Sequence, residues 1–377
     1  MTTKGKTTRR RASRSGAHRR MSYARVGVDT HKEESGLSML LRHLRETLAT
    51  RPAGPGEVKL SFGFFANVIA LGEIGLAIST DGVGTKVLVA QLMDKYDSVG
   101  IDCVAMNVND LLCVGAEPLA MVDYIAVQKP NPRLLSEIAK GLKAGAFAAR
   151  ITIPAGEIAQ LPDVLKDERP GYGFDLAGTA IGTVPLGQIR VGQNIEPDDV
   201  VLGLRSTGVH SNGITLARAL FKKYRPTTYF HELGRPLGQE LLVPTRIYVP
   251  EIMDVLRAGV EVKALIHITS EGFLNLLRVK SDTGYIIHSL PDPHPIFSVI
   301  QREANVSMEE MYRVYNMGIG FCLVVSHRGD HVFRAKEIFK RHDVECYEIG
   351  RAVPSPEKRV TIEPAKLIGR DGRFQKA

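Results

Sequence analysis

Residues 79–86 (STDGVGTK) place a carboxylate, two glycines and a lysine in one short run. Asp81 can hold Mg²⁺ through a hard oxygen ligand. Gly82 and Gly84 allow backbone N–H groups to approach anionic oxygens, and Lys86 adds a positive charge. The run is not a Walker A loop, which requires Gly-x-x-x-x-Gly-Lys-Ser/Thr. Because Asp-Gly followed by Gly is also ordinary turn chemistry, this run alone leaves a metal–phosphate site and a simple turn equally open.

A second group of candidate residues lies on a predicted helix at 98–115, which is apolar nearly all round and therefore predicts burial. It carries Asn107 and Asp110 on one face. A buried carboxylate needs compensation, so Asp110 pairs with a protein cation, belongs to a hydrogen-bond network, or faces a metal or ligand. Glu157 follows a short predicted strand and could join Asp81 and Asp110 around Mg²⁺. An exposed surface glutamate is the plain alternative.

A third candidate is the run 207–213 (TGVHSNG), which lies between a predicted strand and a predicted helix. Free N–H groups at a helix start favour anions. His210 could act as an acid or base, or could donate a hydrogen bond to an oxyanion. Alternatively, Ser211 or Asn212 simply caps the helix. The run 267–272 (HITSEG) repeats the order of strand, polar turn and helix start.

Alternating strands and helices must position these residues. Strands are predicted at 73–78, 118–128, 151–153, 174–184, 200–204, 262–268, 284–288, 318–326 and 345–349, and helices at 34–51, 86–96, 98–115, 131–150, 213–223, 246–258 and 330–341. The alternation indicates the α/β or α+β class. Gly, Pro and Asp cluster at 187–199, where we expect one domain to end and a second to begin.

Composition excludes several classes of protein. The 377 residues are 44% hydrophobic and 24% charged, which is ordinary for a globular protein. No apolar stretch is long enough to cross a bilayer, so we expect no membrane association. The net charge of +8 comes from residues 1–20, which hold eight Lys and Arg and no acid, so the rest is formally neutral and gives no reason to expect nucleic-acid binding. The four cysteines form no Cys-x-x-Cys pair and are expected to be free thiols in the cytoplasm.

The basic tail at 1–20 has almost no large apolar side chain, so we expect it to be disordered. It could be a solvated extension, an organellar transit peptide, or sequence upstream of a true start at Met21. The lack of an amphipathic apolar face counts against the transit peptide. We therefore expect an appendage without a catalytic role.

Taken together, the runs resemble the phosphoribosylformylglycinamidine cyclo-ligase family, also called aminoimidazole ribonucleotide synthetase. The resemblance extends from about Tyr23 to about Val353. The matching runs, in chain order, are YARVGVD at 23–29, STDGVGTK at 79–86, GIDCVAMNVND at 100–110, GAEP at 115–118, GVHSNG at 208–213, PTRIY at 244–248 and NMGIG at 316–320. Several such runs in one order are far more specific than any one of them.

The resemblance implies an α/β (α+β) protomer with two domains, and a homodimer. The N-terminal synthetase domain would span 21–187, with a sheet that joins a barrel-like dimer core and with the ATP and metal side of the site. A C-terminal α/β domain would span 188–353. The last residues, 354–377, are polar and are expected to form a loosely held extension.

The reaction implied is ATP-dependent ring closure of formylglycinamidine ribonucleotide to 5-aminoimidazole ribonucleotide, with release of ADP and phosphate. ATP and Mg²⁺ would be the cofactors. By position in the family runs, the metal ligands would be Asp81, Asp110 and Glu157; the ATP-binding residues would be Gly82, Gly84, Thr85, Lys86, Ser211 and Gly213; and the catalytic residues would be His210, Lys86, Asn107 and Asn212.

Three loops depart from the family pattern: LSFGFF at 60–65, AGEIAQLP at 155–162 and TSEGF at 269–273. The changed positions that matter most for a bound substrate are Ser61, Phe64, Ser270 and Glu271. A carboxylate at Glu271 would repel a phosphate. Two alternatives therefore stay open: a related ATP-dependent phosphoryl-transfer enzyme with another acceptor, such as the thiamine-monophosphate kinase or selenophosphate synthetase branches, or a nucleotide-binding paralogue without catalysis.

Overall fold

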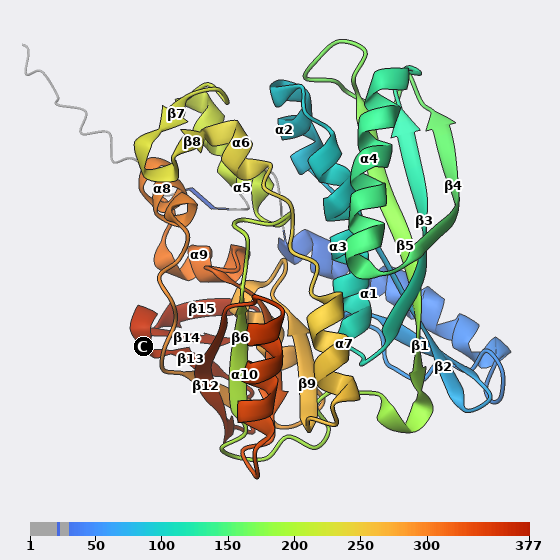
Figure 1. Cartoon of the computed structure of the whole chain (residues 1–377), viewed down its shortest axis with the longest axis vertical. Helices are drawn as coiled ribbons and strands as arrows, with labels where there is room; N and C mark the ends of the chain where they lie inside the picture. The colour runs from blue at the N-terminus through green and yellow to red at the C-terminus, as the bar shows by residue number, and fades with distance from the viewer. Residues whose placement is uncertain (1–20, 23–29) are drawn as a thin grey trace, which may run out of the picture.

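The computed structural model describes residues 21–22 and 30–377, with side chains from Ser35 onward in the second range. The predicted tail at 1–20 and the family run at 23–29 therefore lie outside the described residues. The described chain forms two main sheets, with α-helices packed beside them (Figure 1). The predicted mixed α/β class is confirmed. In the described part of the chain, no helix is long and apolar enough to cross a membrane.

The N-terminal sheet has five strands in the order β1-β2-β5-β3-β4. All neighbours are antiparallel except the parallel pair β3 and β4. The strands are β1 (Asn67–Leu71), β2 (Ile74–Gly82), β3 (Glu117–Val127), β4 (Thr152–Gln160) and β5 (Phe174–Pro185). The prediction for β2 was too short: this strand continues to Gly82, so Asp81 lies within it.

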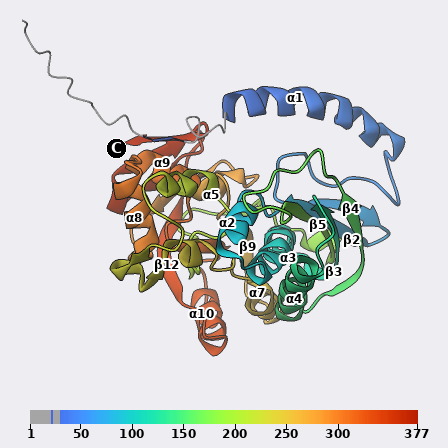
Figure 2. The ribbon, with the colours of Figure 1, turned by 90° about the horizontal axis from the view of Figure 1, so that it is seen from above.

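Two helices, α3 (Asp97–Leu112) and α4 (Pro132–Ala149), cover one face of this sheet (Figure 2). They pack almost backbone to backbone. A Cβ on Gly100 would lie 2.4 Å from the backbone nitrogen of Leu142, so only glycine fits this approach. Asn131 caps α4 as predicted, because its side chain accepts a hydrogen bond from the Leu134 N–H. The close packing holds α3, which carries the predicted site residues, firmly against the sheet.

The remaining N-terminal helices are α1 (Thr30–Glu46), a 3-10 turn (Thr47–Thr50) and α2 (Lys86–Met93). Helix α2 begins at Lys86, directly after the glycine turn, and is shorter than predicted. Helix α1 lies apart from the sheet in Figure 2, and Leu37, Leu40 and Leu44 on it are exposed. These leucines lie on one helix face, which is not covered within the described chain.

The C-terminal sheet has eight strands in the order β15-β14-β13-β10-β12-β6-β11-β9. They are β6 (Val200–Arg205), β9 (Val262–His267), β10 (Thr283–Ile287), β11 (Ile319–Val325), β12 (Cys346–Pro354), β13 (Val360–Ile362), β14 (Leu367–Arg370) and β15 (Arg373–Lys376). The expectation of a loosely held stretch at 354–377 was wrong. This stretch forms three further strands of the sheet, β13 to β15, and apolar side chains such as Val360, Ile362 and Leu367 are buried in them.

The helices of this half are α7 (Val249–Arg257), α8 (Pro295–Glu303), α9 (Met308–Val314) and α10 (His331–Arg341). The predicted helix at 213–223 forms only α5 (Ile214–Ala217) followed by a 3-10 turn (Arg218–Lys222). Two short strands, β7 (Tyr229–Phe230) and β8 (Arg235–Pro236), and α6 (Leu237–Leu241) follow. Helix α7 packs against α3 and α4, so it joins the two halves of the chain (Figure 1).

Candidate active site

Asp81 sits at the end of β2, where α3 fixes the backbone. The Asp81 N–H donates to Asn107 Oδ1 at 2.9 Å, and Asn107 Nδ2 donates to the Asp81 carbonyl at 3.2 Å and to the Cys103 carbonyl at 2.9 Å. Asn107 is fully buried. The prediction that Asn107 orients substrate is therefore wrong in this structure, because its amide is used to hold the strand that carries Asp81.

Two carboxylates meet at this point. Burial, with the charge of Asp110 as the second cause, raises the pKa of Asp81 to about 6. Asp110 Oδ1 lies 2.8 Å from Nδ1 of His267, which is buried at the end of β9. The structure thus brings Asp81 and Asp110 together, as predicted. Two neighbouring hard oxygen donors suit a divalent cation, which relieves their mutual repulsion, so this pair fits Mg²⁺.

His267 is a residue that the sequence reasoning missed. The run 267–272 was noted for its order of strand, turn and helix start, but its histidine received no role. The histidine approaches Asp110 because β9 is the edge strand of the C-terminal sheet and lies next to α3. A ring that holds one carboxylate orients that ligand and tunes its charge.

Lys86 does not point toward this pair. Its side chain and that of Asp102 are both 0% exposed, and their charged atoms lie 2.9 Å apart. The ammonium also donates to the backbone carbonyls of His210 at 3.2 Å and Val243 at 2.7 Å. Because a lysine has three N–H donors and all three are used, the prediction that Lys86 binds phosphate directly is wrong in this structure.

The glycine turn offers fewer free groups than predicted. The Gly82 N–H donates to the Asp81 carboxylate at 2.7 Å, and the Val83 N–H donates to the Leu176 carbonyl at 2.9 Å. Gly84 has a φ of +67°, and a Cβ added there would meet nothing within 4 Å. Open space therefore begins at Gly84 and Thr85, at the N-terminus of α2, where backbone N–H groups can receive an anion.

His210 lies in a tight loop beneath this turn. Its φ is +64°, and its Nε2 accepts the Thr207 N–H at 3.2 Å. Burial lowers the pKa of His210 well below its ordinary value, so the ring is neutral at pH 7. Since Nε2 accepts, Nδ1 carries the proton, and Nδ1 has no hydrogen-bond partner among the described residues. The geometry favours a neutral donor over a general acid.

The rest of the 207–213 loop is held by neighbouring segments. Ser211 Oγ lies 3.2 Å from Thr245 Oγ1, and Asn316 Nδ2 donates to the Gly208 carbonyl at 2.8 Å. Gly213, with a φ of +75°, occupies the N-cap of α5, so neither Ser211 nor Asn212 caps that helix. Asn212 is partly buried in the same loop. Across the turn, Thr85 Oγ1 lies 2.9 Å from Thr215 Oγ1 and joins the two domains.

The glycine run at 316–320 explains why the His210 ring fits. A Cβ on Gly320 would lie 2.6 Å from His210 Cε1 and 2.2 Å from the Tyr248 hydroxyl. The Tyr248 hydroxyl donates to the Arg205 carbonyl at 3.0 Å, so it cannot give way without losing that bond. Glycine at 320 is therefore required by the close approach of two buried rings.

Glu157 is not brought to the carboxylate pair within one protomer. It lies inside β4 rather than after a strand, and it is exposed. The register pairs Glu157 with Tyr124, whereas Asp81 shares its row with Gly178 and Asp123. Because successive residues in a strand point to opposite faces, Glu157 faces away from the side that Asp81 and α3 share.

Two of the three altered loops, 60–65 and 269–273, meet at Arg278. Its guanidinium donates to Glu271 Oε2 at 3.0 Å and lies over the Phe65 ring, with 4.9 Å between the guanidinium carbon and the ring centroid. Phe64 packs edge-on against Phe65 at 5.3 Å. The carboxylate of Glu271 is therefore paired with a cation. This pairing weakens the repulsion of phosphate that the sequence predicts for Glu271.

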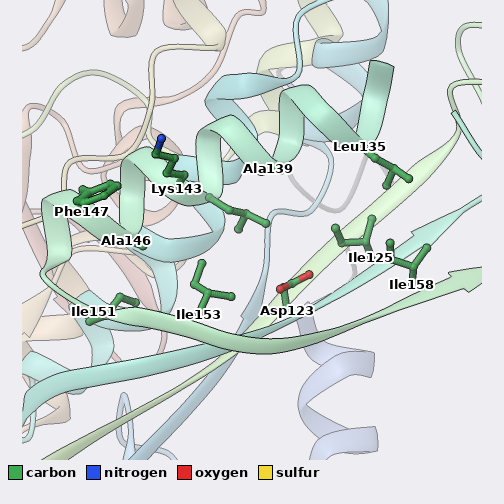
Figure 3. Close-up of a pocket in the computed structure, with 11 residues that line it drawn as sticks. Asp123, Ile125, Leu135, Ala139, Lys143, Ala146, Phe147, Ile151, Ile153 and Ile158 are labelled. Atoms are coloured by element: carbon green, nitrogen blue, oxygen red, sulfur yellow. The ribbon is translucent and has the colours of Figure 1, made fainter. Parts of the chain in front are cut away.

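Two other features lie away from these residues. A groove of about 520 Å³ runs between α4 and strands β3 and β4, with apolar walls and Asp123 at its floor (Figure 3). Glu196, Asp199 and His327 cluster in the C-terminal domain around the ammonium of Lys263. Neither feature includes a predicted site residue. All four cysteines are free thiols, as predicted.

The described residues thus define a protein of two α/β domains, with a carboxylate pair, an open glycine turn and a neutral histidine where the domains meet. Family models place it further. The model for "AIR synthase related protein, N-terminal domain" matches residues 65–184, and the model for the corresponding C-terminal domain matches residues 196–363. The chain belongs to the AIR synthase related family.

Similar proteins agree with this placement. The chain is 47% identical over 309 residues to a protein of Methanothermobacter thermautotrophicus named phosphoribosylformylglycinamidine cyclo-ligase, covering 81% of this chain and 88% of that protein. It is 45% identical over 347 residues to the protein of that name from Thermococcus gammatolerans, covering 92% of this chain and all of that protein.

Solved structures share the fold at much lower identity. AaThiL complexed with AMPPCP and TMP superposes with a TM-score of 0.59 at 14% identity, covering 89% of this chain and 95% of that one. Thiamine-monophosphate kinase from Stenotrophomonas maltophilia gives a TM-score of 0.58 at 18% identity, covering 81% of this chain and 91% of that one. At such identities the likeness concerns the fold alone.

Proposed function

We propose that this protein is a phosphoribosylformylglycinamidine cyclo-ligase, which closes the ring of formylglycinamidine ribonucleotide to 5-aminoimidazole ribonucleotide and converts ATP to ADP and phosphate. The proposal is supported by the cyclo-ligase relatives, which this chain matches over most of their length. The structural observation that carries it is the pair of Asp81 and Asp110. The negative charge of Asp110 contributes to the raised pKa of Asp81, and two carboxylates that interact in this way suit a divalent cation, as in a metal–ATP site.

The reaction requires an amide oxygen to leave, and an amide oxygen is a poor leaving group. Phosphorylating that oxygen gives an iminophosphate, and a nitrogen of the same molecule then attacks the activated carbon while phosphate departs. A protein promotes these steps by neutralising the transferring phosphoryl group, aligning the reacting atoms and excluding water. No group of the chain has to bond covalently to the substrate.

The residues of the site match these tasks. Asp81 and Asp110 would hold Mg²⁺, which neutralises phosphate charge, while His267 fixes the orientation of Asp110. Gly84 and Thr85 offer an open helix N-terminus for phosphate oxygens. His210 donates from Nδ1 as a neutral ring, which suits a developing oxyanion. Ser211, Asn212 and Gly213 remain predicted ATP or substrate contacts of the same loop.

A homodimer is part of the proposal. The face of the N-terminal sheet opposite α3 and α4 exposes apolar side chains, among them Ile74, Val122, Tyr124 and Ile181. An apolar sheet face of this kind marks an interaction surface. Glu157 belongs to the same face, so it would approach a carboxylate pair only across such a dimer. We infer a cytoplasmic location from the free thiols.

One incubation tests the proposal against the kinase alternative, which is favoured only by the fold likeness. The protein is mixed with Mg²⁺-ATP and either formylglycinamidine ribonucleotide or thiamine monophosphate, and ADP is measured with each product. We expect ADP and the aminoimidazole ribonucleotide in equal amounts with the first acceptor. ADP release with the second acceptor alone would establish the kinase. Release with neither would leave a nucleotide-binding paralogue.

A further inference from the structure

The buried ion pair of Lys86 and Asp102 lies outside the chemistry just described. Both side chains are completely buried at the junction of the two domains. Burial lowers the pKa of Lys86, and the neighbouring charge of Asp102 opposes this shift. Such a pair is costly to build, because two charges leave water together. Stability alone therefore does not explain why this ion pair lies between the two domains.

The hydrogen bonds of Lys86 show what it connects. Lys86 opens α2 in the N-terminal domain, directly after the glycine turn. Its ammonium donates to the carbonyl of His210 and to the carbonyl of Val243, which belong to two different loops of the C-terminal domain. One N-terminal side chain thus fixes the backbone of His210 from the other domain.

Asp102 completes the connection from α3. Its Oδ1 accepts both the N–H and the hydroxyl of Thr245, each at 2.7 Å. The Thr245 hydroxyl in turn lies 3.2 Å from Ser211 Oγ, in the loop of His210. The pair therefore reaches the 207–213 loop by two routes, once through Lys86 and once through Asp102 and Thr245.

We propose that Lys86 and Asp102 form an interdomain clamp that positions the His210 loop against the glycine turn. Lys86 is then a positioning residue that acts through His210, and it is not a phosphate ligand. The loss of His210 alignment should reduce turnover, and any change in nucleotide affinity should follow from the loosened loop and not from a lost Lys86–phosphate contact. This kinetic consequence rests on the proposed cyclo-ligase function, whereas the ordering of the loop does not.

The double variant Lys86→Met with Asp102→Asn removes both charges and keeps an acceptor for Thr245. Its matched control is Lys263→Met with Asp199→Asn. That pair is also buried, with charged atoms 3.0 Å apart, but it lies in the C-terminal domain away from the site. Hydrogen exchange is measured on full-length protein for the peptides that cover 207–213 and 243–248.

We expect exchange in both peptides to rise at least tenfold in the clamp variant and to stay within twofold of wild type in the control. Unchanged exchange in the clamp variant would overturn the proposal. If the clamp variant does not fold, Thr245→Val removes the hydroxyl link from Asp102 to Ser211 without unpairing a charge, while the N–H of residue 245 still donates to Asp102. It should raise exchange at 207–213 severalfold, and unchanged exchange would refute a clamp that acts by two routes.

Calorimetry with Mg²⁺ and a non-hydrolysable ATP analogue separates positioning from direct contact. The kcat of the clamp variant should fall at least tenfold, and any loss of analogue affinity should accompany raised exchange at 207–213, because Ser211 and Gly213 of that loop are predicted ATP contacts. A tenfold loss of analogue affinity with unchanged exchange at 207–213 would overturn the proposal, because it would make Lys86 a phosphate ligand. If wild type makes no aminoimidazole product, the proposed function fails, and the exchange result still decides on the clamp.

Discussion

The turn at 79–86 contacts helix α3 at two places. The charges of the side chains that face each other differ between these two contacts. At one end Asp81 approaches Asp110, so like charges face each other beside open space. At the other end Lys86 approaches Asp102, and opposite charges cancel in a fully buried contact. The same two segments therefore supply one pair of like charges, in which Asp110 also contacts His267, and one pair of opposite charges.

The carboxylate pair is therefore suited to chemistry, and the ion pair is suited to holding the structure. A pair of like charges is stabilised when a cation binds, so it is suited to metal–nucleotide chemistry. A compensated pair gains nothing from a ligand, and here it fixes the geometry of the loop that carries His210.

The largest effect is expected for Asp81→Asn. Losing one of the two proposed metal ligands should lower turnover at least ~10³-fold, equivalent to about 4 kcal/mol of transition-state stabilisation. Asp81 is ionised at pH 7, above its folded pKa of about 6, and burial makes that ionised form costly. The metal-free variant should therefore be more stable at pH 7 by on the order of 2–3 kcal/mol. Kinetics and urea unfolding measure both effects.

Asp81→Asn also tests whether the carboxylate pair serves function and not stability. Stability gained together with activity lost would identify Asp81 as a residue kept for function. Full turnover in this variant would remove Asp81 from the metal site. The pH profile sharpens the result: in wild type, Mg²⁺ affinity should fall as pH drops below about 6, because the protonated carboxyl does not bind metal.

Lys86→Met should have the opposite effect on stability. It leaves Asp102 buried without its cation, which costs about 3–5 kcal/mol. Urea unfolding at pH 7 measures the loss, and the single variant is compared with the double variant that also carries Asp102→Asn. The double variant should recover part of the loss. A single variant as stable as wild type would show that the ion pair is not buried in solution.

His267→Asn should weaken the metal site without removing a ligand. The imidazole holds Asp110 Oδ1 at 2.8 Å, and removing such a contact typically costs about 10–100-fold in metal affinity. The Mg²⁺ dependence of turnover at saturating ATP measures the change. An unaltered Mg²⁺ dependence would mean that Asp110 does not need the ring for its orientation.

The smallest effect is expected for Glu271→Gln. Glu271 is 49% exposed and pairs with a partly exposed Arg278, and exposed ion pairs contribute about 0–1 kcal/mol. The KM for the ribonucleotide should change by at most about threefold. A KM lowered tenfold or more would show that this carboxylate does repel the substrate phosphate. Steady-state assays measure the change, with Glu232→Gln as a distant surface control.

The sequence predicted most of the fold because its elements show clear periodicity and end signals. Asn131-Pro132 marks the start of α4, and the alternating apolar residues of β3 and β5 identify both strands. The last three strands were missed because each is three or four residues long, too short to show a period. Such strands form only when an existing sheet edge pairs with them.

The site was predicted in part. Asp81 and Asp110 follow from a carboxylate before a glycine turn and a carboxylate on an apolar helix. Asp102, on the same buried helix, was not singled out; its partner Lys86 lies 16 residues away on another element, so spacing could not pair them. Lys86 was assigned to phosphate binding for the same reason. The sequence shows that the residue is positively charged, but only the packed structure shows which groups its ammonium contacts.

Transfer of an ¹⁸O label tests the central claim most directly. The formyl oxygen of formylglycinamidine ribonucleotide is labelled with ¹⁸O, and the phosphate released with Mg²⁺-ATP is analysed by mass spectrometry. If the amide oxygen is phosphorylated before ring closure, one ¹⁸O atom must appear in each phosphate formed. Aminoimidazole ribonucleotide formed together with unlabelled phosphate would contradict the account.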